Sequence, residues 1–180
     1  MTSPQITARL RSAQPRRLHL VMRDGTMIEG QIQIGEEQTL VSYLNSRRGG
    51  WMNLTRARRP KLDEAPGYMI VQSDHVILAS APDGNVQIAG GASAAIEERQ
   101  VEVVLVGGKT LRGSVSAATQ QRMSDFVSAS GRFLGLAHAI LLPDERALGD
   151  IALHGGSIEI FRDLGGTVPL EEGGSAPEPA

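Results

Sequence analysis

The chain carries one sequence unit twice, and this internal repeat constrains the fold more than any other feature. Residues 17–82 align with residues 100–164 at an offset of 83 positions, which becomes 82 after one deleted residue. The matched positions are turn glycines and apolar sites: Gly25 with Gly108, Gly30 with Gly113, Tyr43 with Phe126, Trp51 with Phe133, Leu54 with Leu136, Ala57 with Ala139, Val76 with Ile158 and Leu78 with Ile160. The repeat predicts two copies of one small structure, which we call copy one and copy two.

Alternating apolar and polar residues indicate β-strands in each copy. In copy one, Leu18, Leu20 and Met22 share one face of a strand, and Asp24-Gly25 follows as a hairpin turn, because Asp-Gly tolerates the positive φ of such turns. The expected strands are 18–23, 28–34, 39–45, 51–58 and 68–79, the last either continuous or divided by a turn at 73–74.

Gly30 and its counterpart Gly113 lie on the inward face in the middle of a predicted strand. A glycine there weakens a strand, so it predicts a sharp bend or the close approach of another backbone. Such bends allow a small sheet to curl into a barrel. The expected fold is all-β: two tandem five-stranded small barrels, Sm-like or SH3-like, joined by a Gly/Ala-rich linker. Trp51 and Phe133 are expected to pack inside the two barrels.

The segments outside the repeat are expected to have little structure of their own. Residues 83–99 are rich in Gly, Ala and Ser and predict a linker, and residues 1–16 predict a flexible N-terminal arm. Residues 165–180 are rich in Gly, Pro and Glu and predict a disordered tail. Barrel repeat 1 then spans 17–82, and barrel repeat 2 spans 100–164.

The composition excludes several classes of protein. The chain has no Cys, so it holds no disulfide, no thiolate zinc site and no cysteine nucleophile. Its N-terminus has no apolar signal-type segment. Its longest apolar run, 133–142, is far shorter than the ~20 residues of a membrane-spanning helix. We expect a cytoplasmic protein that is not integral to a membrane, either free or peripheral at the membrane surface.

Two stretches of sequence resemble known β-barrel families. LHLVMRDGTMIEGQI, and less closely VEVVLVGGKTLRGSV, resemble the first motif of Sm and LSm proteins, an apolar strand, a polar-Gly turn and a strand with an internal Gly. VSYLNSRRGGWMNLTRAR and MSDFVSASGRFLGLAHAI are similar to an uncharacterised bacterial duplicated domain family. The resemblance implies small barrels whose strand edges pair with neighbours. It does not extend to the uridine-binding loops of Sm proteins, since EEQTLVSYLN and QSDHVI stand in their place.

Charge is divided unequally between the copies. Residues 1–84 carry 11 Lys/Arg and 8 Asp/Glu, whereas residues 85–180 carry 7 and 12. The basic excess predicts a site for an anion or an acidic partner in copy one, formed by Arg47, Arg48, Arg56, Arg58, Arg59 and Lys61. The matching strand of copy two is apolar and predicts a protein interface, formed by His138, Ile140 and Leu142. The alternatives are a solvated basic surface and an apolar contact between the two copies.

No arrangement of residues in the sequence predicts catalysis. The four histidines have no partner at metal-ligand spacing, and no Gly-x-Ser-x-Gly motif occurs. Asp63-Glu64 and Asp144-Glu145 lie in aligned loops, where hydrophilic loop residues are the simpler interpretation. We therefore expect no enzyme, no cofactor, no metal and no small-molecule substrate.

The sequence favours a non-catalytic interaction or scaffold protein, such as an accessory subunit of a larger, membrane-associated or soluble complex. Its partners would be a protein, or a second copy of the chain, at repeat 2, and an anionic surface at repeat 1: an acidic protein, lipid headgroups or nucleic acid. The alternative is an Sm-like RNA- or DNA-binding protein. We also expect the strand 139–142 to be paired or covered by copy one, by a second chain or by a partner. The strand around 56–60, which ends in Arg59 and Pro60, is expected to be left to solvent.

Overall fold

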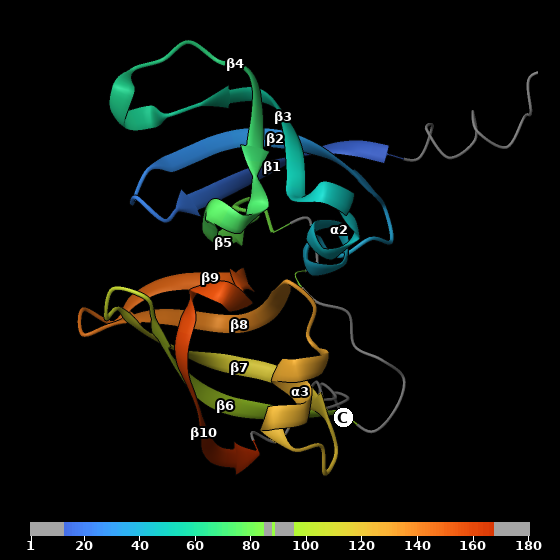
Figure 1. The fold of residues 1–180 in the computed structure, drawn as a ribbon, viewed down its shortest axis with the longest axis vertical. Coiled ribbons are helices and arrows are strands. Elements are labelled where there is room, and N and C mark those ends of the chain that lie inside the picture. The colour runs from blue at the N-terminus through green and yellow to red at the C-terminus, as the bar shows by residue number, and fades with distance from the viewer. Residues whose placement is uncertain (1–12, 85–87, 89–95, 168–180) are drawn as a thin grey trace, which may run out of the picture.

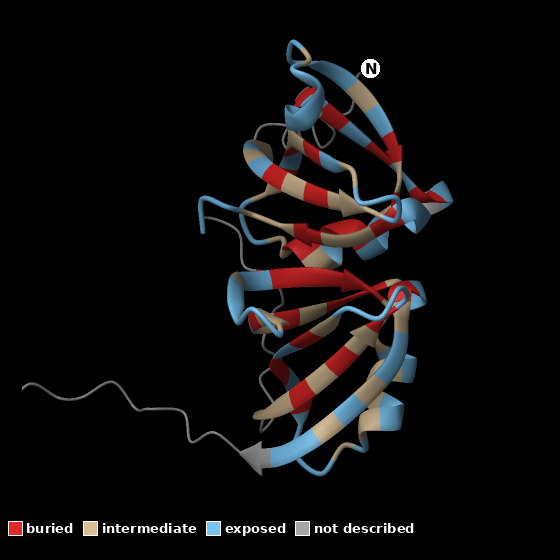
Figure 2. Cartoon of the chain, turned by 90° about the vertical axis from the view of Figure 1, so that its left-hand side faces the viewer, coloured by how far each residue is buried: buried red, intermediate tan, exposed pale blue. Residues whose placement is uncertain are grey.

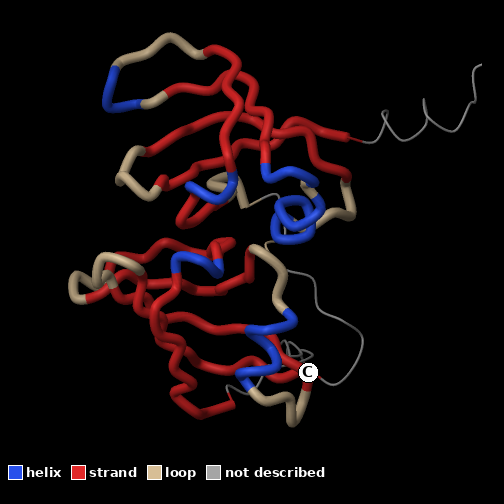
Figure 3. Tube along the Cα trace, in the orientation of Figure 1, coloured by secondary structure: helices blue, strands red, loops and turns tan. Residues whose placement is uncertain are grey.

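The structure, a computed structural model, describes residues 13–84, 88 and 96–167. Strands make up most of it, and the helices are short connections between strands (Figure 3). The predicted all-β class is confirmed. No helix in these described ranges is both long enough and apolar enough to cross a membrane.

The same series of elements occurs in both halves of the chain. The first half contains β1 (Ala13–Met22), β2 (Met27–Gly35), α2 (Leu40–Ser46), β3 (Trp51–Arg58), β4 (Gly67–Gln72) and β5 (Val76–Ser80). The second half contains β6 (Ile96–Leu105), β7 (Thr110–Ala118), α3 (Met123–Ala129), β8 (Phe133–Leu142), β9 (Arg146–His154) and β10 (Ile158–Thr167). A 3₁₀ turn precedes β5 (Ser73–His75) and another precedes β10 (Gly155–Ser157). The division expected at residues 73–74 is therefore present.

All ten strands form one open antiparallel sheet, in the order β10-β6-β7-β8-β9-β5-β1-β2-β3-β4. In Figure 1 the first half lies above the second, and β5 and β9 meet between them. The expectation of two separate five-stranded barrels is corrected by this pairing. Each half would leave a strand edge with unpaired backbone groups, and the edges of β5 and β9 satisfy each other. Leu78, Ala79 and Ser80 pair with Leu153, Ala152 and Ile151.

Two hydrophobic cores lie along this sheet, one in each half, and buried residues alternate with exposed ones along most strands (Figure 2). The cores meet at the β5–β9 seam. Phe133 and Ala152 of the second half are buried in the first core, and Ile77 and Leu78 of the first half pack against the second core. The two halves are therefore joined by side-chain packing as well as by backbone pairing.

The segment 39–45, expected as a strand, forms the helix α2 instead. Thr39 caps the helix, because its hydroxyl oxygen accepts a hydrogen bond from the Ser42 amide at 3.1 Å. Leu40, Tyr43 and Leu44 stand at helical spacing and are all buried. An apolar pattern this short fits a helix and a strand equally well, so the sequence alone does not distinguish the two.

Gly30 and Gly113 mark close backbone approaches, as predicted. Opposite each glycine the neighbouring strand contains a β-bulge, between Thr55 and Arg58 in β3 and between Ala137 and Ile140 in β8. A Cβ atom on Gly113 would lie 2.7 Å from the carbonyl oxygen of Ala137, and one on Gly30 would lie 3.2 Å from Cβ of Leu54. Only glycine fits both places well, and the bulges bend the sheet there.

The expectation that the strand at 56–60 is left to solvent is wrong, and the strand at 139–142 is paired as expected, but by its own half and not by copy one, a second chain or a partner. β3 pairs with β2 and β4, and β8 pairs with β7 and β9, so both strands are interior. Hence residues 139–142 are paired within copy two, and residues 56–58 are not left as a free edge. Trp51, expected in the core, is 54% exposed, whereas its counterpart Phe133 is fully buried.

The sheet extends beyond the expected repeat boundaries. β1 begins at Ala13, β6 begins at Ile96 inside the expected linker, and β10 continues to Thr167. The added residues pair with neighbours, as Ala13 does with Gly35. Within the expected linker, Ile88 is buried, and its carbonyl oxygen accepts a hydrogen bond from the Val41 amide. The expected arm at 1–12 and tail at 168–180 lie outside the described residues.

Polar groups close the seam at one end. The side-chain amide of Asn45 donates to the Phe133 carbonyl oxygen at 2.9 Å and accepts from the Phe133 amide at 2.8 Å. Arg132 donates to the Ser73 hydroxyl at 2.9 Å and lies 3.3 Å from the Asp74 carboxylate. His154 is buried beside them, with its ring edge-on to Phe133 at 5.0 Å.

The close contacts at Gly30 and Gly113 predict that alanine at these two equivalent positions lowers stability by different amounts. Gly113→Ala should destabilise the fold by about 1–3 kcal/mol, because the new methyl group meets a fixed backbone oxygen. Gly30→Ala should cost less, since its methyl group meets side-chain atoms at longer distances. Gly67→Ala, which has nothing within 4 Å, is the control. Urea unfolding checks this, and equal midpoints for the three variants would contradict it.

The buried imidazole in the seam predicts a pH dependence of stability. Burial lowers the pKa of His154 below its ordinary value, the charge of Arg23 acts in the same direction, and Asp74 opposes them. The unfolded chain therefore binds the proton more tightly, so stability is intact above about pH 6.5 and declines as the pH falls below it.

His154→Gln, which introduces the residue of the equivalent position 72, should reduce the loss of melting temperature between pH 7 and pH 5. His138→Gln, at an exposed histidine, should leave that loss unchanged. An identical pH profile for wild type and His154→Gln would show that the buried imidazole does not control it.

Candidate anion-binding groove

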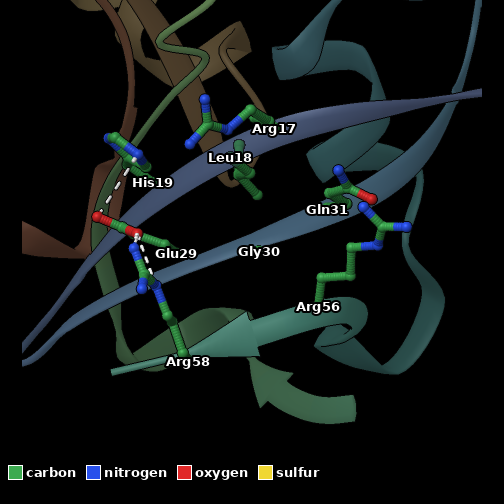
Figure 4. Close-up of a pocket in the computed structure, with 8 residues that line it drawn as sticks. All are labelled: Arg17, Leu18, His19, Glu29, Gly30, Gln31, Arg56 and Arg58. Carbon is green, nitrogen blue, oxygen red and sulfur yellow. Dashed lines mark hydrogen bonds and ion pairs between the residues drawn. The ribbon is translucent and has the colours of Figure 1, made fainter. Parts of the chain in front are cut away.

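The bulge in β3 creates a groove on the outer side of the first half. It is a cavity of about 280 Å³ lined by residues of three neighbouring strands: Arg17, Leu18 and His19 of β1, Glu29, Gly30 and Gln31 of β2, and Arg56 and Arg58 of β3. The two bulge residues opposite Gly30 displace β3 from β2 at this point. Arg56 has φ of 48°, a left-handed backbone conformation, and its exposed side chain projects over the groove beside Gln31 (Figure 4). We call this cavity the arginine groove.

Positive charge prevails in the arginine groove. Glu29 is the one carboxylate among the lining residues, and Arg58 already occupies it: Nε and Nη2 of Arg58 donate to Oε2 of Glu29 at 3.1 and 2.9 Å. Nε2 of His19 lies 3.9 Å from Oε1 of the same carboxylate. Arg17 lies 3.6 Å from Asp83 outside the groove. The lining therefore holds three guanidinium groups against one carboxylate.

Arg56 is the cation available to a ligand. Among the described residues it has no hydrogen bond and no ion pair, and its backbone is fixed by the bulge. Guanidinium groups bind carboxylates and phosphates with two parallel hydrogen bonds. An anionic group in the groove can therefore bind the guanidinium group of Arg56, with the amide of Gln31 beside it (Figure 4).

The structure separates most of the other predicted basic residues from this groove. Arg59 is bound to Glu64, and this hydrogen bond lowers the pKa of the Glu64 carboxyl group. Arg47 lies over the ring of Tyr43, with its guanidinium carbon 4.1 Å from the ring centre. Lys61 is exposed in the 3₁₀ turn after β3. The side chain of Arg48 lies outside the described residues. Only Arg56 and Arg58 of the predicted set line the groove.

Sequence analysis missed Arg17, His19, Glu29 and Gln31. They come from two strands distant from β3 in the sequence, and the pairing of Leu18 with Gly30 brings them opposite the bulge. A signal for them was present, because Gly30 predicted a close approach of another strand. The sequence did not say which strand it would be.

The corresponding place in the second half has different chemistry. His138 occupies the bulge position there, with φ of 51° and an exposed side chain, and its backbone amide donates to Asp150 at 2.9 Å. Ile140 and Leu142 are half-buried. None of these three residues, expected at a protein interface, takes part in the β5–β9 seam. The predicted contrast between a cationic and an apolar strand is present, but the two halves do not meet there.

A second, larger cavity of about 600 Å³ opens at the other end of the seam. Its walls are mostly apolar, with Ile77, Leu78, Leu111, Leu141 and Ile151 among them, and exposed charged residues stand at its edge. In the part of the chain that the structure describes, no group of three or more His, Asp or Glu residues could hold a metal ion.

Comparison of this chain with protein-family models, with curated proteins and with solved structures finds no match. The site is therefore interpreted from its own geometry and charge.

The charge of the groove predicts a gain of affinity when its carboxylate is removed. Glu29→Gln should raise the salt concentration at which the chain elutes from a heparin column, because Arg58 is released toward the ligand. Glu37→Gln removes the same charge at an exposed position elsewhere and is the control. If both variants elute together, the groove is not where the polyanion binds.

Proposed function

We propose that this chain is a non-catalytic interaction or scaffold protein, an accessory subunit that binds an acidic segment of a protein partner in the arginine groove. The observation that supports this most directly is Arg56, held over the groove by the bulge and without a partner among the described residues. The bulge fixes the backbone of Arg56, and no described residue competes with a ligand for its guanidinium group. The partner complex lies either in the cytoplasm or at a membrane surface.

Two features support an acidic protein segment, and not a single small ion, as the ligand. The groove is lined by residues of three neighbouring strands, β1, β2 and β3. Arg17 on β1 and Arg56 on β3 stand apart from each other and from the Glu29–Arg58 pair (Figure 4). A carboxylate of an acidic segment can therefore contact Arg56 while a second one approaches Arg17. Electrostatic complementarity of this kind directs association and selects the partner.

We also infer that the two halves are copies of one Sm-like barrel unit that diverged at the bulge. The equal order of elements and the paired glycines support this. In copy one the bulge residue and the residue two positions later are Arg56 and Arg58, and in copy two they are His138 and Ile140. On this proposal copy one kept or acquired the anionic partner, and copy two did not.

The test compares proteins that co-purify with the tagged full chain and with the double variant Arg17→Glu/Arg56→Glu. Loss of two charge-assisted hydrogen bonds should weaken binding about tenfold or more, so acidic partners should disappear from the variant. Lys109→Glu carries the same kind of charge reversal in the exposed β6–β7 turn and should retain them. A partner set that is identical for all three proteins, or empty for wild type, overturns the proposal.

A parallel measurement with single-stranded RNA separates the nucleic-acid alternative. Binding at ~50 mM salt that weakens with a log–log slope of about −0.7 per phosphate contact, and that the double variant abolishes, would replace the acidic protein by nucleic acid as the ligand. Under the present proposal RNA is not retained above the level of the double variant.

A further inference from the structure

The β5–β9 seam provides the pattern for a second contact. In this seam β5, the last strand of the first half, pairs with β9, the fourth strand of the second half. Their equivalents, β10 and β4, are the two outermost strands of the sheet. Neither β4 nor β10 has a second strand neighbour among the described residues. The two strands that would form a second seam of this kind, β4 and β10, are therefore both present on the molecule, but they are not paired with each other.

Exposed apolar side chains collect at these two edges. Tyr68 and Ile70 of β4 are 61% and 57% exposed, and Ile160 and Leu164 of β10 are 50% and 43% exposed. Solvent-facing edge strands usually carry charges or prolines that prevent pairing with another chain. β4 carries no charge and no proline, and β10 exposes Ile160 and Leu164 although it also contains Glu159, Arg162 and Asp163. Exposed apolar residues of this kind are typical of surfaces that are covered in the assembled state.

Trp51 gives an independent indication. Its counterpart Phe133 is fully buried because it lies against the first half at α2, where Asn45 binds its backbone on both sides. Trp51 begins β3 in the equivalent place but is 54% exposed. The residue is exposed because no helix covers it within the molecule, and α3 is the equivalent of the helix that would do so.

The helix α3 has apolar residues that the molecule itself does not fully cover. Leu44 of α2 is fully buried and Tyr43 is nearly so, whereas their counterparts on α3, Val127 and Phe126, are only half-buried. Thus one end of the molecule lacks a cover for a tryptophan, and the other end has a helix with an incompletely covered apolar face.

We propose that β4 of one copy of this chain pairs antiparallel with β10 of a second copy, head to tail, with Trp51 of the first copy packed against α3 of the second. The internal seam fixes the register. Leu78, Ala79 and Ser80 correspond to Ile160, Phe161 and Arg162, and Leu153, Ala152 and Ile151 correspond to Val71, Ile70 and Met69. Phe161 of one copy therefore faces Ile70 of the other across the new ladder.

A second copy fits these edges better than an unrelated strand does. Both halves of the contact are present on the same chain, and each matches a half of the seam that already exists within it. The contact is heterologous, so the assembly as a whole keeps one free β4 edge and one free β10 edge until it closes or extends further. Its ladder lies on β4 and β10, which do not line the arginine groove, and Trp51 lies at the start of β3, outside the groove lining. The contact is therefore independent of the proposed partner.

The new seam should be weaker than the internal one. Ser128 stands in place of Asn45, Gly50 in place of Arg132, and Gln72 in place of His154. The two amide hydrogen bonds and the cation of the internal seam are thus missing. Assembly is therefore expected to depend on protein concentration in the micromolar to submillimolar range.

The test measures the solution mass of the full chain by sedimentation over this range. Wild type should exceed the monomer mass as concentration rises. Ile70→Lys and Ile160→Lys each place a charge on one edge and should each lower the association constant about tenfold or more. Val106→Lys, at an apolar residue of similar exposure (56%) in the β6–β7 turn, is the matched control and should associate as wild type does.

Mixing distinguishes a head-to-tail contact from other ones. The Ile70→Lys chain keeps an intact β10 edge and the Ile160→Lys chain an intact β4 edge, so an equal mixture should form a dimer although neither variant does alone. A β4–β4 contact would instead leave Ile160→Lys associated by itself and would overturn the proposal. A wild type that stays monomeric throughout would do the same and would assign the edges to a different protein.

The single tryptophan supplies a second readout. Trp51 is the only Trp in the chain, so fluorescence reports on this position alone. Its emission should shift to shorter wavelength as wild type is concentrated, and the shift should be absent in Ile160→Lys, which leaves Trp51 itself unchanged. A concentration-dependent mass without any shift would show that the copies associate elsewhere.

Discussion

Backbone pairing between β5 and β9 is the interaction on which the arrangement of this molecule depends. Three residue pairs form the ladder, and they convert two short sheets into one. The pairing sets the two cores side by side, so that Phe133 and Ala152 enter the first core while Leu78 packs against the second. Asn45 and Arg132 then fix the end of the seam. Without this ladder neither helix α2 nor the start of β8 would have its present cover.

The arginine groove depends on a separate constraint, the close approach at Gly30. Because Leu54 and Ala57 come within about 3.3 Å of the position that a Cβ would occupy, β2 and β3 can meet only at glycine. The bulge that results lifts Arg56 out of the ladder and separates it from Glu29. Arg58 lies beyond the bulge, returns to the ladder opposite Glu29 and neutralises it. The same local distortion thus creates one paired and one unpaired arginine within three residues.

Much of the fold could be predicted from the sequence, because its signals are local. The Asp24-Gly25 hairpin follows from turn chemistry, and Gly25 has φ of 80° in the structure. The inward glycines follow from their place in an apolar alternation. The helix α2 was missed because a helix of only seven residues and a short strand have similar apolar patterns. The strand order across the seam was missed as well, since backbone pairing between distant edges leaves no periodic trace in sequence.

The site could be predicted only in part, for a related reason. Arg56 and Arg58 belong to a local cluster of basic residues, but the cluster includes Arg59 and Arg47, whose charges are engaged by Glu64 and Tyr43. The unpaired state of Arg56 depends on its place in the bulge opposite Gly30 of β2, a strand that is distant from it in the sequence. Trp51 was predicted to be buried and is exposed. Its counterpart Phe133 is buried only because residues of the other half cover it, and nothing in the local sequence indicates such a contact.

The backbone of the bulge has a consequence for how the two halves can diverge. Arg56 and His138 have φ of 48° and 51°, so the two positions share one conformation although their side chains differ. The backbone of the bulge packs against Gly30 in the first half and against Gly113 in the second. The residue after the bulge position is Ala57 or Ala139, and both alanines are fully buried. The residue on top projects into solvent and contributes nothing to either core. Selection can therefore change what this position recognises, one half at a time, while the scaffold that displays it remains as it is.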